Sequence, residues 1–283
     1  MKKIGFIDYY IDEWHANNYP AWIRKATKNH DVYLAWEEQT KEGGMSLDAW
    51  SEKQQVKAAE SMEQVIEECD VLIVLAPSNP EVHERLAGPA LRSGKPVYVD
   101  KPFAQDRKTG ERMFALAEKN HTPMMSSSAL RFGSVLQKTV NETHIGKPAQ
   151  LAVAMGGGRS FWEYSIHQLE MLVMLMGTGA RRVMQCGTTK ANHMIIDYGS
   201  GRRACMTLSG GQGFQISAYY DEADPVVIPT MDDFWDGFIA SLLKFFDSGI
   251  PSIPKAQTLE IVSLVETGVK ALEIPDIWFP INA

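Results

Sequence analysis

The sequence predicts an α/β fold: a domain built on a parallel sheet, followed by an α+β domain with an open, mainly antiparallel sheet. Short apolar runs alternate with helical segments over the first half of the chain, as parallel βαβ units require. Several strand-like segments separated by Gly-rich turns fill the second half. With 283 residues the chain is long enough for two hydrophobic cores, and we expect domains at residues 1–125 and 126–283.

In the first domain, the strongest signal is the continuously apolar run at residues 71–76, typical of a strand buried on both faces. Pro80 opens the helix after it, and Gly94 can close that helix in a left-handed conformation. The other expected strands are residues 3–7, 32–36, 96–99 and 123–127, and the other expected helices are residues 21–29, 46–68 in two pieces, and 107–120.

In the second domain, the reversal Gly199-Ser200-Gly201 lies between two expected strands and favours an antiparallel meander. Such a sheet has one face free to meet solvent or a partner subunit. The expected strands are residues 183–186, 193–198, 204–208 and 214–220, and the expected helices are residues 160–176, 232–247 and 256–272.

Composition excludes several classes of protein. The 28 basic and 35 acidic residues give a net charge of −7, which repels nucleic acid and anionic membranes, so neither is expected as a partner. The longest apolar runs are far below the ~20 residues that span a bilayer. The three cysteines are an odd number without metal-ligand spacing, so neither a disulfide framework nor a zinc site is expected. We expect a cytoplasmic protein.

Ligands of an open parallel sheet bind at the carboxyl ends of its strands. Asp100-Lys101-Pro102 directly follows the expected strand 96–99 and therefore lies at that edge. A lysine taken alone is typical of a solvated surface. The position of Lys101 after a buried strand favours a role in a site instead.

A row of polar side chains marks the expected helix 160–176. Glu163, His167 and Glu170 are spaced i, i+4 and i+7, which places them on one face. The rest of this helix is apolar nearly all round, so the polar face must be hydrogen-bonded or must border a cavity. Ser160 and Glu163 also fit a capping box, with Glu163 reaching back to the backbone N–H of Ser160. A metal site at the three polar residues is chemically allowed as well.

The stretch from Cys69 to Asp106 resembles the end of the nucleotide domain in the Gfo/Idh/MocA family, named after glucose-fructose oxidoreductase, inositol dehydrogenase and rhizopine catabolism. That family has a proline-containing turn, a helix beginning with a His, and Glu-Lys-Pro. The matching residues are Pro77, Ser78, Asn79, His83, Gly94, Lys95 and Asp100-Lys101-Pro102, with Asp in place of Glu. Further matches follow in order at Arg131-Phe132, Ile145-Gly146-Lys147, residues 163–170 and Gly177.

The resemblance implies a Rossmann-type domain and hydride transfer between NAD and a hydroxyl carbon of a sugar or cyclitol. His167 would take or give the hydroxyl proton, and Lys101 would hydrogen-bond the reacting oxygen. Glu163 would orient His167 or bind a second hydroxyl. A homodimer or homotetramer is implied as well. The implied cofactor-binding residues are Asp8, Tyr9, Tyr10, Glu37, Pro77, Ser78, Asn79, His83, Asp100 and Lys101.

The first loop departs from the family, because no glycine occurs between Gly5 and Gly43. A dinucleotide fold places Gly-x-Gly-x-x-Gly after its first strand, so that the backbone can approach the diphosphate. The residues here are Asp8-Tyr-Tyr-Ile-Asp-Glu13, whose aromatic rings would occupy that space and whose carboxylates would repel phosphate. Glu37 and Glu38 end the second strand, where an acid that binds the NAD ribose belongs, and favour NAD over NADP.

Two other functions stay open. A lyase or isomerase acting on a keto-sugar could use Lys101 and His167 for proton transfer without nicotinamide, and the first loop fits this better. A non-catalytic relative could keep the fold to bind a ligand or a partner. Arg131, Arg159, Trp162 and Tyr164 could line a sugar pocket, whereas His15, His30, His121, His144 and His193 have no supporting constellation.

Overall fold

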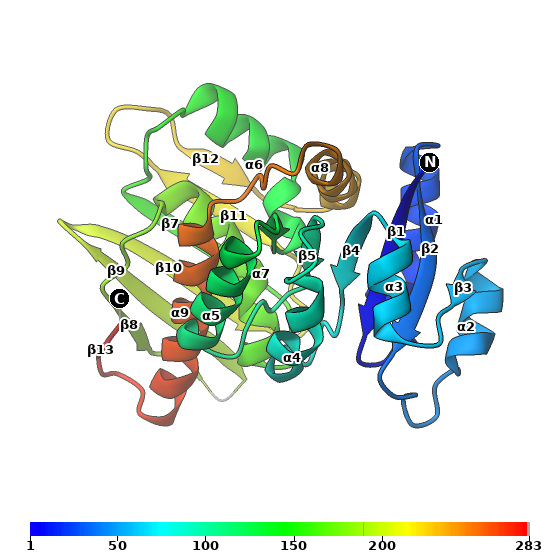
Figure 1. The fold of residues 1–283 in the computed structure, drawn as a ribbon. Helices are drawn as coiled ribbons and strands as arrows, with labels where there is room; N and C mark the ends of the chain where they lie inside the picture. The colour runs from blue at the N-terminus through cyan, green and yellow to red at the C-terminus, as the bar shows by residue number, and fades with distance from the viewer. Residues whose placement is uncertain (189, 282–283) are drawn as a thin grey trace. The chain divides into compact units, whose positions relative to one another are not determined.

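The computed structural model describes residues 1–188 and 190–281. The chain divides into two compact units (Figure 1): unit 1 is Met1–Ser126 with Ile239–Pro254, and unit 2 is Ser127–Phe238 with Lys255–Ala283. The expected division assigned residues 239–254 to the second domain, whereas they pack within unit 1. One reason is that the Lys2 ammonium donates a 2.7 Å hydrogen bond to the carbonyl of Phe246 and pairs with Asp247 at 3.2 Å.

Unit 1 is built on a six-stranded parallel sheet of order β3-β2-β1-β4-β5-β6, which confirms the Rossmann-type domain. The order reverses between β1 and β4, and this switch point is where open α/β sheets bind ligands. The strands are β1 (Lys2–Asp8), β2 (His30–Glu37), β3 (Lys57–Ala58), β4 (Val71–Val74), β5 (Val97–Val99) and β6 (Met124–Met125). The helices are α1 (Trp14–Ala26), α2 (Leu47–Gln54), α3 (Met62–Glu68), α4 (Pro80–Ala90) and α5 (Arg107–Lys119).

Two local differences from the expected elements concern helix ends. Helix α1 begins at Trp14 and not at residue 21, because the side chain of Glu13 caps it and Pro20 lies inside the helix. Helix α4 ends at Ala90, and Gly94 adopts its left-handed φ of +74° in the turn that follows.

Unit 2 contains a seven-stranded mixed sheet of order β12-β11-β7-β10-β9-β8-β13, in which β7 and β10 pair parallel and the other pairs are antiparallel. The strands are β7 (Leu151–Gly156), β8 (Arg182–Gln185), β9 (Ala191–Gly199), β10 (Arg202–Ser209), β11 (Gln215–Tyr219), β12 (Val226–Ile228) and β13 (Phe279–Pro280). This confirms the mainly antiparallel sheet. Strand β7 was not expected, because its inward positions are the small residues Ala152, Ala154 and Gly156, which give a weak apolar alternation.

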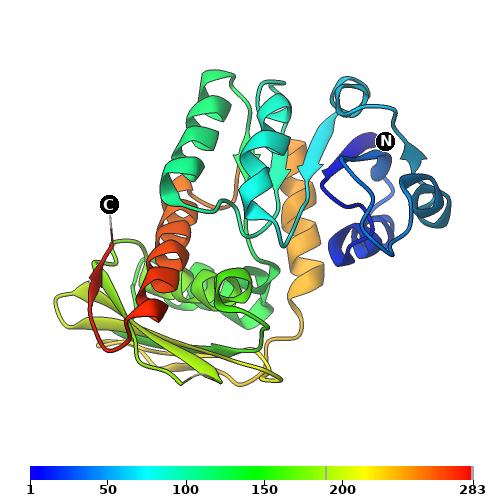
Figure 2. The same ribbon diagram turned by 90° about the horizontal axis from the view of Figure 1, so that it is seen from below.

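The helical segments of unit 2 are η1 (Ala129–Phe132), α6 (Ser134–Lys138), η2 (Thr139–Thr143), α7 (Phe161–Met176) and α9 (Lys255–Glu273), and α8 (Phe234–Ser248) begins in unit 2 and ends in unit 1. Helices α7 and α9 lie side by side on one face of the sheet, and no described helix of this unit covers the opposite face (Figure 2). Helix α7 is buried along most of its length, as its all-round apolar sequence requires.

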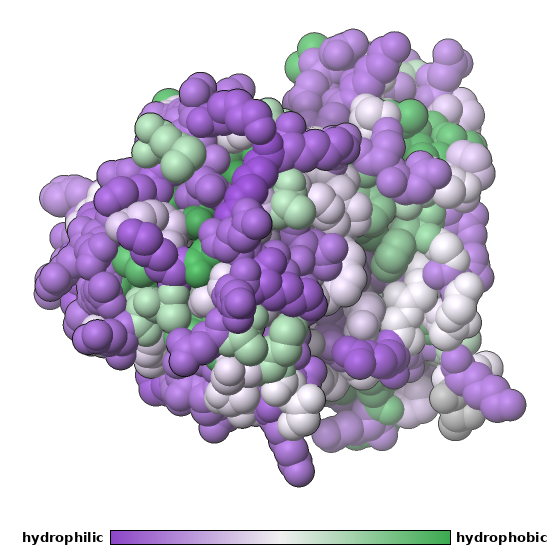
Figure 3. Space-filling model, turned by 90° about the vertical axis from the view of Figure 1, so that its right-hand side faces the viewer, coloured by the Kyte–Doolittle hydropathy of each residue, from purple (hydrophilic) through white to green (hydrophobic). Residues whose placement is uncertain are grey.

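The surface in Figure 3 is mainly hydrophilic, with smaller hydrophobic areas among polar and charged side chains. No helix within residues 1–188 and 190–281 is both long enough and apolar enough to cross a membrane.

Strand β1 ends on Asp8, whose fully buried carboxylate joins the ends of β1 and β4. Its Oδ1 accepts hydrogen bonds from the backbone N–H groups of Tyr9 at 2.7 Å, Tyr10 at 3.3 Å and Ala76 at 2.9 Å. Ala76 has a left-handed φ of +72°, which a β-carbon disfavours, so this hydrogen bond helps to hold the turn after β4. Burial, together with the charge of Glu13, raises the pKa of Asp8 well above its ordinary value.

The native protein therefore binds the Asp8 proton more tightly than the unfolded chain does. The contribution of the protonated Asp8 carboxyl to the free energy of unfolding is present below the unfolded pKa of about 3.9. This contribution is lost as the pH rises through the native pKa of Asp8. We expect the free energy of unfolding of Asp8→Asn not to show this fall with pH, because the amide oxygen still accepts the backbone hydrogen bonds and carries no charge. Urea unfolding at about pH 5 and about pH 8 should then show a smaller fall in the variant than in the wild type. Equal falls would contradict the assignment.

Candidate functional site

The parallel sheet of unit 1 brings four of its strand ends to one edge, at the switch point. Asp8 ends β1, Glu37 ends β2, the turn from Ala76 follows β4, and Asp100-Lys101 follows β5. The expected cofactor-binding residues therefore lie along one edge, as their positions in the sequence indicated. Their hydrogen bonds decide what this edge can bind.

Glu13 occupies the N-terminus of helix α1. Its Oε2 accepts the N–H of His15 at 2.8 Å, and its Oε1 accepts the N–H of Ala16 at 2.6 Å. In a dinucleotide fold these N–H groups, at the positive end of the first helix, face the diphosphate. Burial raises the pKa of Glu13, with the charge of His15 acting to lower it and that of Asp100 to raise it.

Glu37, the acid expected to bind a ribose, instead hydrogen-bonds within the chain, in part to the loop after β1. It is 9% exposed; its Oε2 accepts the N–H of Ile11 at 2.9 Å, and its Oε1 accepts the hydroxyl of Thr40 at 2.8 Å. The rings of Tyr9 and Tyr10 lie next to each other, with centroids 4.3 Å apart. As they stand, these residues do not fit the diphosphate and ribose of NAD, because the backbone donors of the loop already bind the protein's own carboxylates.

The turns after β4 and β5 are joined by two side chains. His83 is fully buried, and its two ring nitrogens each lie 3.0 Å from a carbonyl oxygen, those of Phe103 and Ala76. Burial lowers the pKa of His83, so the neutral ring donates to one carbonyl at a time. The Lys101 ammonium lies 3.4 Å from the carbonyl oxygen of Pro77.

The other residues of the turn after β4 are held near the start of α4. Asn79 precedes that helix, and its side-chain amide donates a 2.8 Å hydrogen bond to Glu81. Ser78 lies between Pro77 and Asn79 in the same turn.

His15 forms a buried pair with Asp100, which the sequence did not indicate. Its Nδ1 lies against Asp100 Oδ2, and its ring stacks on Tyr19 with centroids 5.2 Å apart. Burial acts to raise the pKa of Asp100, but the charges of His15 and Lys101 and the hydrogen bonds from these residues lower it overall. The statement that His15 has no supporting constellation is therefore wrong. The sequence offered no signal for this pair, because the first helix was expected to begin only at residue 21 and Asp100 is 85 residues away.

In unit 2, His167 on helix α7 is held by Ser128, whose hydroxyl lies 2.7 Å from His167 Nδ1. Ser128 is itself fixed, because its backbone N–H donates a 3.0 Å hydrogen bond to Glu170 Oε1 and its hydroxyl accepts the N–H of Leu130 at 3.3 Å. Glu170 also forms a buried ion pair with Arg131 at 2.5 Å. His167 and Glu170 are thus brought together through Ser128, which sequence reasoning missed.

Glu163 has other partners. The guanidinium of Arg159 donates a 2.7 Å hydrogen bond to its Oε1, and the hydroxyl of Ser160 donates a 3.4 Å hydrogen bond to its Oε2. Ser160 is the N-cap residue of α7, as expected, but its side chain makes no cap hydrogen bond, so the serine half of the predicted capping box is wrong. Within the described ranges, no three His, Cys, Asp or Glu side chains are placed to hold a metal ion.

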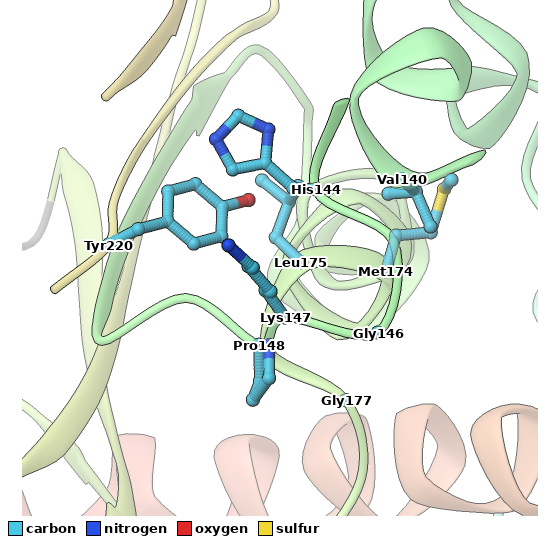
Figure 4. A pocket seen from close by; sticks show the side chains of 9 residues that line it. All are labelled: Val140, His144, Gly146, Lys147, Pro148, Met174, Leu175, Gly177 and Tyr220. Atoms are coloured by element: carbon cyan, nitrogen blue, oxygen red, sulfur yellow. The ribbon is translucent and has the colours of Figure 1, made fainter. Parts of the chain in front are cut away.

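A pocket of about 220 Å³ opens at the far end of α7 (Figure 4). It is lined by Val140, His144, Gly146, Lys147, Pro148, Met174, Leu175, Gly177 and Tyr220. His144 stacks against Tyr220, with ring centroids 4.2 Å apart. Gly177 follows His167 by ten residues, which is about 15 Å along a helix. This pocket therefore does not contain the polar face of α7.

Solved structures share this architecture over nearly the whole chain. A probable dehydrogenase from Thermotoga maritima is 16% identical with a TM-score of 0.81, over 99% of this chain and 98% of that chain. Myo-inositol dehydrogenase from Lactobacillus casei, solved with NAD(H) and myo-inositol, is 11% identical with a TM-score of 0.82, over 100% and 97%. The WlbA dehydrogenase from Bordetella pertussis, solved with NADH and UDP-GlcNAcA, is 12% identical with a TM-score of 0.76, over the full length of both chains.

No curated protein sequence matches the chain. A family model described as "Oxidoreductase family, NAD-binding Rossmann fold" matches residues 16–127. That segment includes β2 to β6, His83 and Asp100-Lys101-Pro102, and it begins after the loop that carries Glu13. Through this match, residues 16–127 are similar to the Gfo/Idh/MocA family of oxidoreductases.

Proposed function

We propose that this protein is an oxidoreductase that moves hydride between NAD(H) and a hydroxyl carbon of a sugar or cyclitol. The observation that carries the proposal is the family match at residues 16–127, which contains Lys101 directly after β5 at the edge where such sheets bind ligands. The Lactobacillus casei relative binds NAD(H) and myo-inositol, and the Bordetella pertussis relative binds NADH and a UDP-sugar. Myo-inositol and the UDP-sugar both carry the hydroxyl carbons that the proposed reaction requires.

His167 would accept the hydroxyl proton during oxidation and return it during reduction. The contact of its Nδ1 with Ser128 holds the ring in one orientation, as a proton-transfer group requires. A serine hydroxyl can donate to Nδ1 or accept from it, so Ser128 can serve both protonation states of the ring. Lys101 would donate a hydrogen bond to the reacting oxygen and stabilise its negative charge. Glu163 would bind a second hydroxyl.

One observation favours a second candidate, a lyase or isomerase that acts on a keto-sugar without nicotinamide. The carboxylates of Asp8, Glu13 and Glu37 hold the backbone donors at which a dinucleotide would bind. Proton transfer beside a carbonyl needs an acid and a base but no diphosphate site. Exchange of the substrate α-proton with solvent deuterium in the absence of NAD(H), abolished by His167→Asn, would support this candidate.

The assembly and compartment proposed for the protein follow the same reasoning. The sheet face that no described helix of unit 2 covers could pair with a second copy, which supports a homodimer or homotetramer. The three free cysteines, Cys69, Cys186 and Cys205, suit the reducing cytoplasm.

Titration with NADH and NADPH tests the proposed cofactor directly. Fluorescence energy transfer from the seven tryptophans to the reduced nicotinamide should rise to saturation below about 1 mM NADH, with weaker binding of NADPH because of the acidic end of β2. Lys101→Ala measured in parallel reports whether this lysine contributes to binding. Absence of any saturable signal up to about 10 mM would contradict the dehydrogenase.

His167→Asn tests the proposed acid and base. We expect kcat to fall by about 10² to 10⁴-fold with little change in KM, because the lost proton transfer belongs to the chemical step. Ser128→Ala should lower kcat less and shift the pH profile, because it removes only the group that holds the ring. A His167→Asn variant that keeps both the rate and the pH profile of the wild type would rule out this role.

A further inference from the structure

The carboxylate of Glu13 stands where an anionic ligand of this fold would stand. Its two oxygens accept the N–H groups of His15 and Ala16, two donors in the first turn of a 13-residue helix, at 2.8 and 2.6 Å. Each N–H points at one acceptor, so a phosphate and Glu13 cannot use the two donors together. We infer that Glu13 is an internal occupant of the phosphate position, so that dinucleotide binds at this groove only when Glu13 leaves helix α1.

The loop before Glu13 is held closed in the same manner. Asp8 accepts the N–H groups of Tyr9 and Tyr10, and Glu37 accepts that of Ile11. Three carboxylates thus accept five of the backbone N–H groups between Tyr9 and Ala16. A dinucleotide would have to find its hydrogen bonds among donors that are already satisfied.

One polar atom inside this cluster is not satisfied. Asp8 is fully buried, and its Oδ2 has no hydrogen-bond partner among the described residues. A buried oxygen of this kind is costly unless something pairs with it. Asp8 lies within electrostatic reach of Glu13, so whatever occupies the phosphate position also acts on Asp8.

The titratable groups around Glu13 come from three elements. Asp8 lies at the end of β1 and Asp100 at the end of β5, while His15 and Tyr19 lie on α1 itself. The two aspartates oppose a second anion at this place. His15, the basic side chain of this group, is already paired with Asp100. The cluster therefore favours a single resident carboxylate over a ligand phosphate.

An ion pair links the two sides of the switch point. Arg85 on α4, which follows β4, contacts the carboxylate of Glu38, which follows β2. Because β1 lies between β2 and β4 in the sheet, the pair connects the elements on either side of the β1 loop. This connection reinforces the closed loop, although both side chains are partly exposed and the pair alone contributes little.

The inference deepens the proposed function and can be tested without it. The probe is inorganic pyrophosphate, titrated calorimetrically into wild type and Glu13→Gly, since glycine restores the residue type that such loops use. We expect Glu13→Gly to bind pyrophosphate at least about tenfold more tightly than the wild type, because two hydrogen bonds to a charged group become available. Glu13→Gln, which keeps the shape and loses the charge, should lie between the two and serves if the glycine variant fails to fold.

Asp106→Gly is the matched control. Asp106 caps α5, another 13-residue helix of unit 1, by accepting the N–H of Thr109 at 2.7 Å. This variant loses a capping carboxylate as Glu13→Gly does, but it opens no position at the switch point. Its pyrophosphate affinity should equal that of the wild type. Equal affinity of wild type, Glu13→Gly and Glu13→Gln would overturn the inference, as would tighter binding in Asp106→Gly.

NADH titrated into the same proteins separates this inference from the proposed function. If Glu13→Gly gains pyrophosphate but no protein binds NADH, Glu13 is the internal occupant and the dehydrogenase proposal fails. If the wild type binds NADH and Glu13→Gly binds neither NADH nor pyrophosphate more tightly than the wild type does, the dehydrogenase proposal stands and the inference about Glu13 fails. A parallel gain in both ligands supports both.

Discussion

The hydrogen bonds between backbone N–H groups and carboxylates at the end of β1 are the interaction on which the nucleotide edge depends. Asp8, Glu13 and Glu37 each accept N–H groups from the loop or from the helix that follows it. In a glycine-rich loop those N–H groups are available to hydrogen-bond a ligand, whereas here they are hydrogen-bonded to side chains of the same chain. Three buried or half-buried acids therefore set the conformation of the loop that carries Tyr9 and Tyr10, and Asp8 also holds the left-handed Ala76 in the turn after β4.

The polar face of α7 follows the same rule in the other unit. A polar side chain on a buried helix must be paired, and each of the three acids and bases predicted on this face has a partner. Glu170 pairs with Arg131 and holds the backbone of Ser128, and the hydroxyl of Ser128 holds His167. His167 is thus positioned through a short chain of contacts that starts from a buried ion pair. Such support is what a proton-transfer group needs to keep one orientation.

Much of the fold could be predicted from local sequence, because its signals are local. The apolar run of β4, the proline at the start of α4 and the apolar α7 each specify their own element, and Asp100-Lys101 reports the end of β5. The start of α1 and strand β7 could not be predicted. Glu13 is an unusual cap residue, and the inward side of β7 is made of small residues whose burial depends on the helix packed against them.

The sequence indicates the element in which each candidate site residue lies, but not the contacts that the residue makes. Lys101 and His167 were predicted from their positions in elements, whereas their partners Pro77 and Ser128 are distant in the chain. The partners of Glu163, Arg159 and Ser160, are close to it in sequence. His15 and Asp100 are 85 residues apart, and Ser128 and His167 are 39 apart. No periodicity links such pairs, since only the order of the strands and the packing of α7 bring them together. The same limit applies to the first loop, where the sequence indicated repulsion of phosphate but not the donors that replace it.

The amide protons of His15 and Ala16 test the account most directly. In protein labelled with ¹⁵N and ¹³C, the amide signals of His15 and Ala16 and the carboxyl signal of Glu13 are followed through a pH titration. Their pH dependence reports whether the Glu13 carboxylate accepts these two hydrogen bonds. The account predicts that both amide signals move with the Glu13 titration and shift to higher field in Glu13→Gln, where the acceptor loses its charge. Amide signals that stay constant while Glu13 titrates would contradict this assignment of the hydrogen bonds, because the N-terminus of α1 would then be open to a ligand.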